Sequence, residues 1–587
     1  MMPTVSLTMI VRNEEKNLAY CLNSVKTAVD EIVIVDTGST DQTISIAERY
    51  TDKVYHYLWQ DDFSAARNFA ISKSSGQWIL VMDADEFLEL GAGGLQTVIG
   101  ADSFTETIFL PLRCLHDDMD PQCYNHYLVL RLFRNLPEYR FAGAIHEQVI
   151  ITCPEKVRIA HEPVLWHKSQ IGKGRNKKRK RNLDLLKTAC RAEPDNYFLQ
   201  YYQGVEWLGL GKFARAVKLF EAACSKLLPE EVLFRAPAVG GLILGLRHQG
   251  KLDEAFSVCS GECEVYPDYT DLYFDAGTIL EEQGKFHQAI GWFNGAINKG
   301  KPPPEFNHTS GTESFLAYQH LGRCYEAVGN PRQAEAYYRQ AFCANNEYIG
   351  SLYQLFFLKL SQIGTEQLLL YFRELGCFEK EHCVKFLGLL FLEAGLPDLA
   401  AVCYEAAAEQ DDLTNWCRSL VLGGELSKAI AVINTARLNN EALPYTAEVC
   451  EIVAAALSGE YRRAKDLALA MWRQPQKRSG ALALLMVLAN FEAGNSGIKP
   501  EKTREPEVVQ TLIDILDSCL RFRGRKKPEN WQLAARYVEL ANKTLHCLTA
   551  LTAESNKVLI AYLQAKTQAI YKVLDYKSLA ARCLYHG

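Results

Sequence analysis

The 587-residue chain contains no apolar run that approaches the roughly 18 to 20 residues needed to cross a bilayer. Its N-terminal residues lead directly into a strand-like segment and lack the charged and apolar regions of a signal peptide. The 18 cysteines are scattered without a Cys-x-x-Cys pair, so neither a zinc site nor a disulfide framework is predicted. We therefore expect no transmembrane segment and a cytoplasmic location.

An excess of basic residues is also missing. The 64 Lys and Arg residues are outnumbered by 70 Asp and Glu residues, which gives a net charge of −6. This balance argues against a general nucleic-acid-binding protein, because neutralising phosphates requires a basic domain. The composition, 48% hydrophobic and 23% charged, is typical of a globular protein, and the length exceeds what one core accommodates. At least two domains are expected.

Before residue 190, strand-like runs alternate with helical patterns. The predicted strands are 5–11, 31–35, 53–57 and the run that ends at Met82, and the predicted helices are 17–26, 43–50 and 63–73. This alternation predicts βαβ units and a mainly parallel sheet. Beyond residue 105 the pattern is mostly strand and loop, as in 107–112 and 127–133. We predict an α/β domain over residues 1–190 that is doubly wound at its start and mixed at its end.

After residue 190 the pattern changes to pairs of helices that repeat. A glycine followed five residues later by alanine occurs seven times, mostly at a spacing near 34: Gly211/Ala216, Gly250/Ala255, Gly284/Ala289, Gly329/Ala334, Gly395/Ala400, Gly424/Ala429 and Gly459/Ala464. A degenerate copy is expected near Gly364. In four copies another glycine stands seven residues earlier: Gly204, Gly277, Gly322 and Gly388. The period resembles tetratricopeptide repeats. An all-α solenoid is predicted over 191–500, with a helical region over 501–587 that continues or caps it; a homodimer through the repeats stays open.

An acidic cluster follows the most apolar strand of the first domain. Residues 78–82 are apolar, and Asp83, Ala84, Asp85 and Glu86 come next. Carboxylates at the carboxyl end of a strand in an open α/β sheet face a crevice. Asp83 and Asp85 offer the hard oxygen ligands that Mg²⁺ or Mn²⁺ prefers, and such an ion holds a diphosphate. The alternative is a solvated acidic turn.

Three more polar clusters fall at the same predicted edge. Asp36 ends the second strand, where a carboxylate accepts hydrogen bonds from a base or ribose, or simply caps the next helix. The first strand ends at Val11 and continues into polar Asn13 and Glu14. Arg67, near the start of a helix, brings a guanidinium to this edge. Four polar clusters at strand ends or helix starts of one sheet are difficult to explain as independent accidents.

These motifs together resemble the family 2 glycosyltransferases. The resemblance rests on residues 8–15, 33–41, 66–68 and 80–86, in this order and spacing. It implies a GT-A fold, a nucleotide-diphosphate-sugar donor and an Asp-x-Asp metal motif. The second half is similar to a branch in which Arg131-Leu132-Phe133-Arg134 precedes Phe141-Ala142-Gly143-Ala144-Ile145-His146-Glu147. Several members of that branch carry tetratricopeptide repeats, and one group, the sublancin-type peptide S-glycosyltransferases, modifies peptide side chains.

The resemblance also implies roles for individual residues. Asp36 would hold the base of the donor, expected to be uracil, with Arg67 nearby, and Asp83 would reach the ribose or a metal-bound water. Asp85 would ligate a divalent ion, Mn²⁺ or Mg²⁺. Glu147 stands where the family places the base that deprotonates the acceptor, although a structural glutamate is the alternative. The remaining donor-binding positions are Val11, Asn13, Glu14 and Ala84.

A histidine completes the metal site in related enzymes, and His167 matches it. The sequence departs from the commoner His-Tyr-Gly-Tyr pattern, because His-Lys-Ser-Gln stands here, and His161 is a rival. The basic run over 173–181 is a solvated helix start or a flap over the diphosphate.

The sequence therefore predicts a metal-dependent inverting glycosyltransferase that uses a UDP-sugar. Its acceptor is a peptide or protein side chain, or alternatively a saccharide, and the sugar is not specified by these motifs. A non-catalytic repeat scaffold with a degenerate transferase domain is the competing hypothesis. A nucleotidyltransferase shares the sheet and the carboxylates, but the triphosphate loop expected after the first strand is absent.

Overall fold

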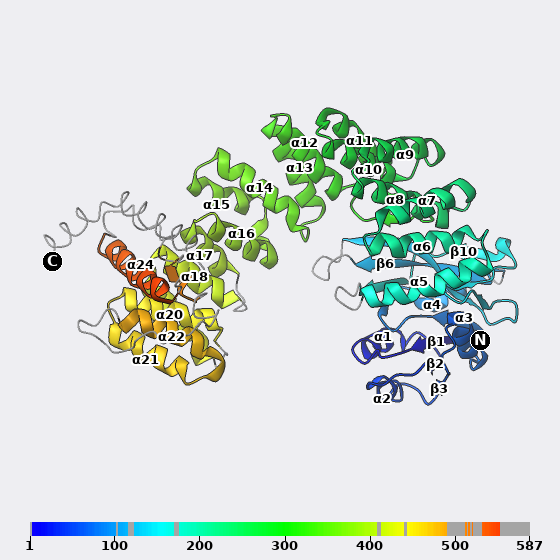
Figure 1. Cartoon of the computed structure of the whole chain (residues 1–587), viewed down its shortest axis with the longest axis horizontal. Coiled ribbons are helices and arrows are strands. Elements are labelled where there is room, and N and C mark those ends of the chain that lie inside the picture. The colour runs from blue at the N-terminus through cyan, green and yellow to red at the C-terminus, as the bar shows by residue number, and fades with distance from the viewer. Residues whose placement is uncertain are drawn as a thin grey trace. The chain divides into compact units, whose positions relative to one another are not determined.

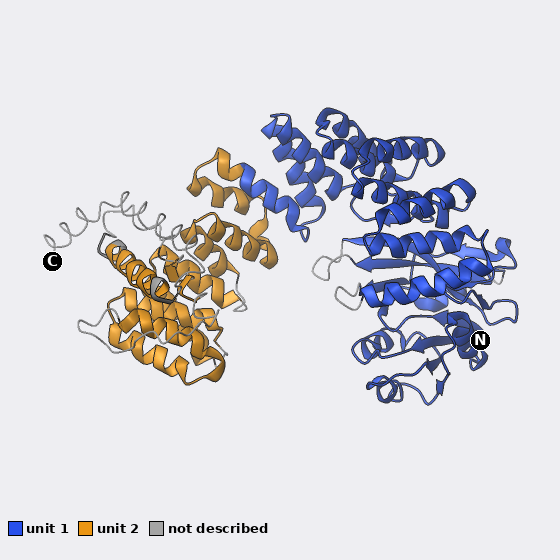
Figure 2. Cartoon of the chain, in the orientation of Figure 1, with its two compact units in different colours: residues 1–358 blue, residues 359–587 orange. Residues whose placement is uncertain are grey.

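The computed structural model describes residues 3–100, 104–115, 123–168, 175–407, 412–439, 443–489, 511–513, 515–516, 519 and 531–551. The chain divides into two compact units, Met1–Leu358 and Lys359–Gly587 (Figure 2). The first unit holds the sheet together with the first helical pairs, and the second holds further helical pairs. The predicted domain limits at 190 and 500 stay predictions, and most of 501–587 lies outside the described residues.

A mixed sheet forms the N-terminal part, with strand order β3-β2-β1-β4-β7-β6-β11-β5. Strands β3, β2, β1 and β4 are parallel, whereas β7 is antiparallel to both β4 and β6. The predicted α/β fold, parallel first and mixed later, is confirmed. The strands are β1 (Val5–Val11), β2 (Glu31–Asp36), β3 (Val54–His56), β4 (Trp78–Val81), β5 (Glu86–Glu89), β6 (Thr107–Leu115), β7 (Tyr124–Arg134), β8 (Phe141–Ala142), β9 (Gln148–Val149), β10 (Val157–Ile159), β11 (Val164–Lys168) and β12 (His308–Thr309).

Helices cover the sheet and then continue as antiparallel pairs (Figure 1). Those of the sheet region are α1 (Leu18–Val25), α2 (Thr43–Ala47), α3 (Phe63–Ser72) and α4 (Gly94–Ile99). The first unit continues with α5 (Arg175–Ala192), α6 (Tyr197–Gly209), α7 (Phe213–Lys226), α8 (Val232–His248), α9 (Leu252–Val265), α10 (Thr270–Glu282), α11 (Phe286–Lys299), α12 (Phe315–Ala327), α13 (Pro331–Ala344) and α14 (Ile349–Gln362), which reaches the unit boundary.

The second unit repeats the same arrangement. Its helices are α15 (Thr365–Glu374), α16 (Glu381–Glu393), α17 (Pro397–Ala406), α18 (Leu413–Gly423), α19 (Leu426–Leu438), α20 (Tyr445–Leu457), α21 (Tyr461–Trp472), α22 (Arg478–Ala489) and α24 (Trp531–Leu551). Across the part of the chain that the structure describes, no helix combines the length and the hydropathy that a membrane span needs.

The repeated glycines end the first helix of each pair. All seven have positive φ, between 69° and 87°, a left-handed conformation that glycine adopts without a Cβ penalty. The alanine five residues later is fully buried in every copy. Gly364 differs, because it precedes α15 with φ −68°. The seven copies therefore fold as the sequence predicts, and the degenerate copy does not share their turn.

The four additional glycines lie where two helices of a pair cross. A Cβ placed on Gly277 would lie 2.7 Å from the ring of Phe293, and one on Gly204 would lie 2.8 Å from Phe220. Gly322 and Gly388 face Tyr338 and Tyr404 in the same way. Each aromatic residue stands 16 positions after its glycine. Glycine is required here because the ring fills the space that a side chain would occupy.

A short strand from the helical pairs joins the sheet. The α11–α12 connection contains β12, which pairs antiparallel with β7 through His308 opposite His126 and Thr309 opposite Asn125. The backbone N–H of Thr309 also donates to Asp271 of α10 at 2.8 Å. This pairing explains why the sheet and the first helical pairs form one compact unit.

Candidate functional site

The ends of β1 and β2 are tied into one hydrogen-bonded edge. The carbonyl of Val11 accepts from the N–H and hydroxyl of Thr37 at 3.0 and 3.1 Å. Asn13, in a left-handed conformation with φ 57°, accepts from the N–H of Thr40 at 2.8 Å through Oδ1. The N–H of Glu14 donates to Thr43 Oγ1 at 2.7 Å. The residues after β1 that are predicted to bind the sugar donor therefore lie at the same edge as those after β2.

Asp36 is buried at the end of β2, with an exposed fraction of 2%. Its Oδ2 accepts from the N–H of Gly38 at 3.0 Å, and its Oδ1 accepts from the N–H of Ser39 at 3.1 Å. Gly38 and Ser39 precede α2, whose N-cap is Gln42, so these bonds stabilise the turn after β2 rather than cap the helix. Oδ2 also accepts from the N–H of Ser39 at 3.2 Å, whereas Oδ1 keeps a second lone pair, so the geometry is also compatible with binding a base through Oδ1.

Two arginines hold the first aspartate of the acidic cluster. Arg67 Nη2 donates to Asp83 Oδ1 at 2.8 Å, and Arg131 Nη2 donates to Asp83 Oδ2 at 2.7 Å. Arg131 also donates to Glu86 Oε1 at 2.9 Å, and the N–H of Asp83 donates to Glu86 Oε2. Both oxygens of Asp83 thus accept from guanidinium groups, and the partly exposed Asp83 joins a network of largely buried side chains.

The pKa values of the two carboxylates in this network are shifted in opposite directions. Burial disfavours the charge of Asp83, but the adjacent Arg131 and Arg67 outweigh it and hold its pKa well below the usual range. Burial raises the pKa of Glu86, and the neighbouring charge of Asp83 raises it further. The network therefore holds Asp83 ionised and favours the neutral form of Glu86.

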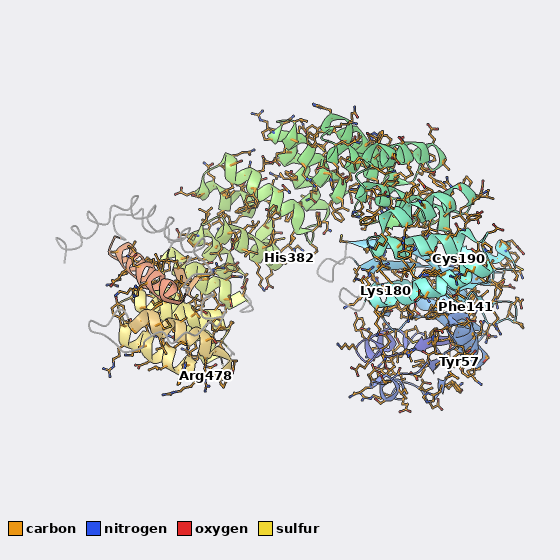
Figure 3. The ribbon with its side chains drawn as sticks, viewed as in Figure 1. Tyr57, Phe141, Lys180, Cys190, His382 and Arg478 are labelled. Atoms are coloured by element: carbon orange, nitrogen blue, oxygen red, sulfur yellow. The ribbon has the colours of Figure 1, made fainter. Side chains whose placement is uncertain are left out.

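Arg67 connects this network to Glu147. Its Nε donates to Glu147 Oε1 at 2.5 Å, and its guanidinium carbon lies 5.5 Å from the ring centroid of Phe141, labelled in Figure 3. Arg67 was expected beside the base with Asp36, whereas these contacts place it between Asp83 and Glu147. Among the described residues, Arg67 is the one hydrogen-bond donor to Glu147, so Oε2 stays available. Arg67 Nη1 is buried without a partner in the same part of the structure.

Asp85 lies beside His167 of β11. His167 Nε2 lies 3.4 Å from Asp85 Oδ2, and both side chains are partly exposed, at 31% and 21%. The hydrogen bond to Asp85, followed by one to Cys114, raises the pKa of His167 to about 10. No group of three His, Cys, Asp or Glu ligands occurs among the described residues. A carboxylate and an imidazole nevertheless fit an ion that takes its other ligands from a diphosphate and water.

The remaining predicted residues differ in how close they lie to these groups. Ala84 is buried between the two aspartates. Burial raises the pKa of Glu14, which the hydrogen bond to Asn17 opposes, and the charges of Asp85 and of Lys178 on α5 act on it as well. The basic run thus begins α5 close to the predicted donor residues (Lys180 is labelled in Figure 3), although 173–174 lie outside the described residues. His161 follows β10 and has an exposed side chain.

Three roles were not predicted from the sequence. Arg131 was quoted only as part of a motif, and Glu86 received no role. A lone arginine within the apolar strand 127–133 was the available signal, because charged residues are rarely buried without a partner. The third is Tyr202 of α6, whose ring stacks on His146 beside Glu147, with centroids 3.6 Å apart.

Comparisons with known proteins agree with this architecture. Residues 6–108 match the family model described as glycosyl transferase family 2, and residues 317–346 match a tetratricopeptide repeat model. The second match covers α12 and α13. The chain therefore joins a family 2 glycosyltransferase domain at its N-terminus to tetratricopeptide repeats.

Individual relatives are named either for repeats or for glycosyl transfer. A TPR repeat-containing protein of Synechococcus elongatus is 34% identical over 43% of this chain and 64% of its own length. The SPbeta prophage-derived glycosyltransferase SunS of Bacillus subtilis is 27% identical over 37% of this chain and 52% of its own length. An uncharacterized glycosyltransferase of Rickettsia felis is 41% identical over 15% of this chain and 30% of its length. The chain spans less than two thirds of each of these relatives.

Proposed function

We propose that the protein is a metal-dependent, inverting glycosyltransferase that moves a sugar from a UDP-sugar to an acceptor. The observation that carries this proposal is the Arg67 bridge. One guanidinium binds Glu147 at 2.5 Å and Asp83 at 2.8 Å, although these residues lie 64 positions apart in sequence. The proposed base therefore lies beside the acidic cluster, as a single-displacement transferase requires.

The donor would occupy the edge formed by the ends of β1, β2 and β4. Asp36 would bind the base, Asn13 and Asp83 would line the path to the sugar, and Asp85 with His167 would hold a divalent ion. The ion supplies Lewis-acid stabilisation of the negative charge that develops on the departing diphosphate. Such an ion would take the place of the proton on His167, because a coordinating imidazole must be neutral.

Glu147 would act as the general base of the transfer. Its Oε2, to which no described residue donates, would accept the proton of the acceptor group as that group attacks the anomeric carbon. The new bond to the acceptor forms while the bond from carbon to the diphosphate oxygen breaks, and the electron pair leaves with UDP. Arg67 would keep the carboxylate oriented during this step.

A peptide or protein side chain is the proposed acceptor. Tetratricopeptide repeats build extended surfaces that bind polypeptides, and the first helical pairs share a compact unit with the sheet. The similarity to SunS, a glycosyltransferase, supports the same class of reaction. A saccharide acceptor is the second possibility to be screened.

The deciding experiment is a donor screen with the full-length protein. Each UDP-sugar is incubated with Mn²⁺ or with EDTA, and released UDP is measured, because water replaces a missing acceptor. We expect one donor to turn over with Mn²⁺ only, and Asp85→Ala to lower this rate by at least about 100-fold. Calorimetry that detects no binding of any donor with Mn²⁺ present would instead support the scaffold hypothesis.

A further inference from the structure

The loop between β8 and β9 carries Glu147 in a constrained backbone. Gly143 has φ 95°, and His146, directly before Glu147, has φ 51°. For a residue with a Cβ, this left-handed backbone conformation costs about 1–3 kcal/mol, and it persists only where surrounding contacts offset the strain. The conformation of His146 thus requires an external contact that keeps the loop in place.

That contact comes from the first helices after the sheet. Ile145 is 3% exposed and belongs to a hydrophobic cluster with Leu186 of α5 and Leu199 of α6. The ring of His146 stacks on Tyr202 of α6, with centroids 3.6 Å apart and an angle of 11° between the planes. The loop that carries the proposed base is therefore packed against α5 and α6 rather than only against its own sheet.

Tyr202 is itself fixed by aromatic neighbours. Phe198, one turn earlier on α6, meets its ring edge-to-face at 4.8 Å, and Tyr201 lies at the same centroid distance. Phe198 in turn contacts Phe234 of α8. An aromatic pair contributes about 0.5–1.5 kcal/mol beyond the area it buries, which is comparable to the strain at His146.

His146 presents a neutral ring to this stack. Burial lowers its pKa to about 4, and its Nε2 has no hydrogen-bond partner among the described residues. Within the described part of the chain, no hydrogen bond fixes the orientation of this ring. The stack on Tyr202 is consequently the contact that orients the imidazole and the backbone behind it.

We infer that Tyr202 is a positioning residue for Glu147, so that the first repeat helix forms part of the active site. Tyr202 holds His146 in its left-handed conformation, and this places the carboxylate of Glu147 on Arg67. The inference rests on the proposed function insofar as Glu147 is the base. It extends that function by giving the repeats a part in the chemistry besides any binding of an acceptor.

The test compares three variants of the full-length protein. Tyr202→Ala removes the stack, and Tyr202→Phe keeps the ring and removes the hydroxyl. Phe213→Ala is the matched control, because Phe213 stacks on His248 at 4.5 Å and 10° elsewhere in the first unit. For each, kcat and KM are measured for Mn²⁺-dependent hydrolysis of the UDP-sugar that the wild type accepts, together with hydrogen–deuterium exchange of residues 143–149.

We expect Tyr202→Ala to lower kcat by at least about 20-fold, with the KM for the donor within about twofold of the wild-type value, since a displaced base weakens the chemical step and not donor binding. Tyr202→Phe should retain kcat within about threefold. Exchange of 143–149 should accelerate in Tyr202→Ala and stay unchanged in Phe213→Ala.

Three outcomes would overturn the inference. They are a kcat loss in Phe213→Ala equal to that in Tyr202→Ala, an equal loss in Tyr202→Phe, or unchanged exchange of 143–149 in Tyr202→Ala. If the wild type turns over no donor at all, the proposed function fails, and the exchange measurement alone then decides whether Tyr202 holds this loop.

Discussion

Two regions of the molecule bury their side chains in opposite ways. At the sheet edge, ionisable side chains pair with one another, and all but the partly exposed Asp83 are largely buried: Arg67, Arg131, Asp83, Glu86 and Glu147. At the crossings of the helical pairs, burial depends on the volumes of the facing side chains instead. Buried ion pairs contribute little net stability compared with apolar packing of the same size. The contrast supports the proposal that the charged groups at the edge serve the transfer reaction.

The helical pairs use two versions of one crossing. Four pairs combine glycine with an aromatic residue, as in Gly277 and Phe293. The same two positions hold Ile243 and Cys259 in one pair, Cys417 and Ile433 in another, and Ile452 and Ala468 in a third, all of them buried. A large residue on one helix is matched by a smaller one on the other, so total volume is preserved. Substitutions here should change stability and leave the chemistry intact.

The largest effect is expected where the charge network meets the reaction. Glu147→Gln keeps the shape of the side chain and its bond from Arg67 but removes the base. The transfer rate should fall by about 10³-fold, while the Kd for the donor measured by calorimetry changes less than about threefold. Glu155→Gln, an exposed glutamate nearby, is the control. Loss of donor binding in Glu147→Gln would assign Glu147 to the donor site instead.

The largest loss of stability is expected when one partner is removed from the charge network at the sheet edge. Arg131→Met leaves Asp83 and Glu86 without their shared guanidinium and should lower the free energy of unfolding by about 3–5 kcal/mol. Arg134→Met on the same strand, which stacks on Trp78, is the control, with an expected loss of about 1 kcal/mol. Urea denaturation measures both. Equal losses would show that Arg131 serves packing alone.

The charged cluster of His308, Asp271 and Glu313 makes the stability of this region depend on pH. Burial would lower the pKa of His308, but hydrogen bonds to Asp271 and Glu313 outweigh it and raise the pKa to about 9. The protonated His308 therefore stabilises the fold fully below about pH 6.5, which is the pKa of a histidine in the unfolded chain. This stabilisation is lost as the pH rises through about 9. The rise from 6.5 to about 9 corresponds to about 3 kcal/mol.

Hydrogen exchange of residues 124–128 and 306–311 should therefore accelerate between pH 7 and 10 by more than the intrinsic chemical rate. In His308→Gln this additional acceleration should disappear. His126, whose pKa burial lowers to about 4, does not titrate in this range. An identical profile in the wild type and His308→Gln would rule out the histidine as the cause.

The smallest effect is expected from glycine substitutions in the helical pairs, which test the packing where two helices cross. Gly277→Ala places a Cβ 2.7 Å from Phe293 and should cost about 1–2 kcal/mol. Gly291→Ala in α11, where a Cβ meets nothing within 4 Å, should instead stabilise the protein by about 0.5–1 kcal/mol. Thermal unfolding distinguishes these signs. A stabilised Gly277→Ala would mean that the ring moves aside without penalty.

Local patterns made much of this structure predictable. Alternating apolar runs located the strands, and the glycine–alanine spacing located the turns between helices. The acidic residues after β4 marked the edge because strand ends and polar residues coincide there. Contacts between distant residues were harder to predict. The bond between Arg67 and Glu147 joins residues 80 positions apart, and nothing in either local sequence specifies the other.

The same limit explains what was missed in the repeats. Tyr202 lies among aromatic residues whose spacing predicts only a helix core, and its contact with His146 follows from how α6 packs on the loop. The strand β12 has two residues, too short to produce an alternating pattern. Both features depend on tertiary packing rather than on local preference.

The pairing of β12 with β7 has a consequence for how the protein is made. The ribosome completes the last core strand of the sheet, β11, at residue 168, yet the outer edge of β7 at 125–126 is covered only after residue 309 has been synthesised. Until then the nascent chain presents an open strand edge, which is prone to pair with other chains. If the residues after 190 were replaced by the repeats of another protein, β12 would be lost and this edge of β7 would stay uncovered.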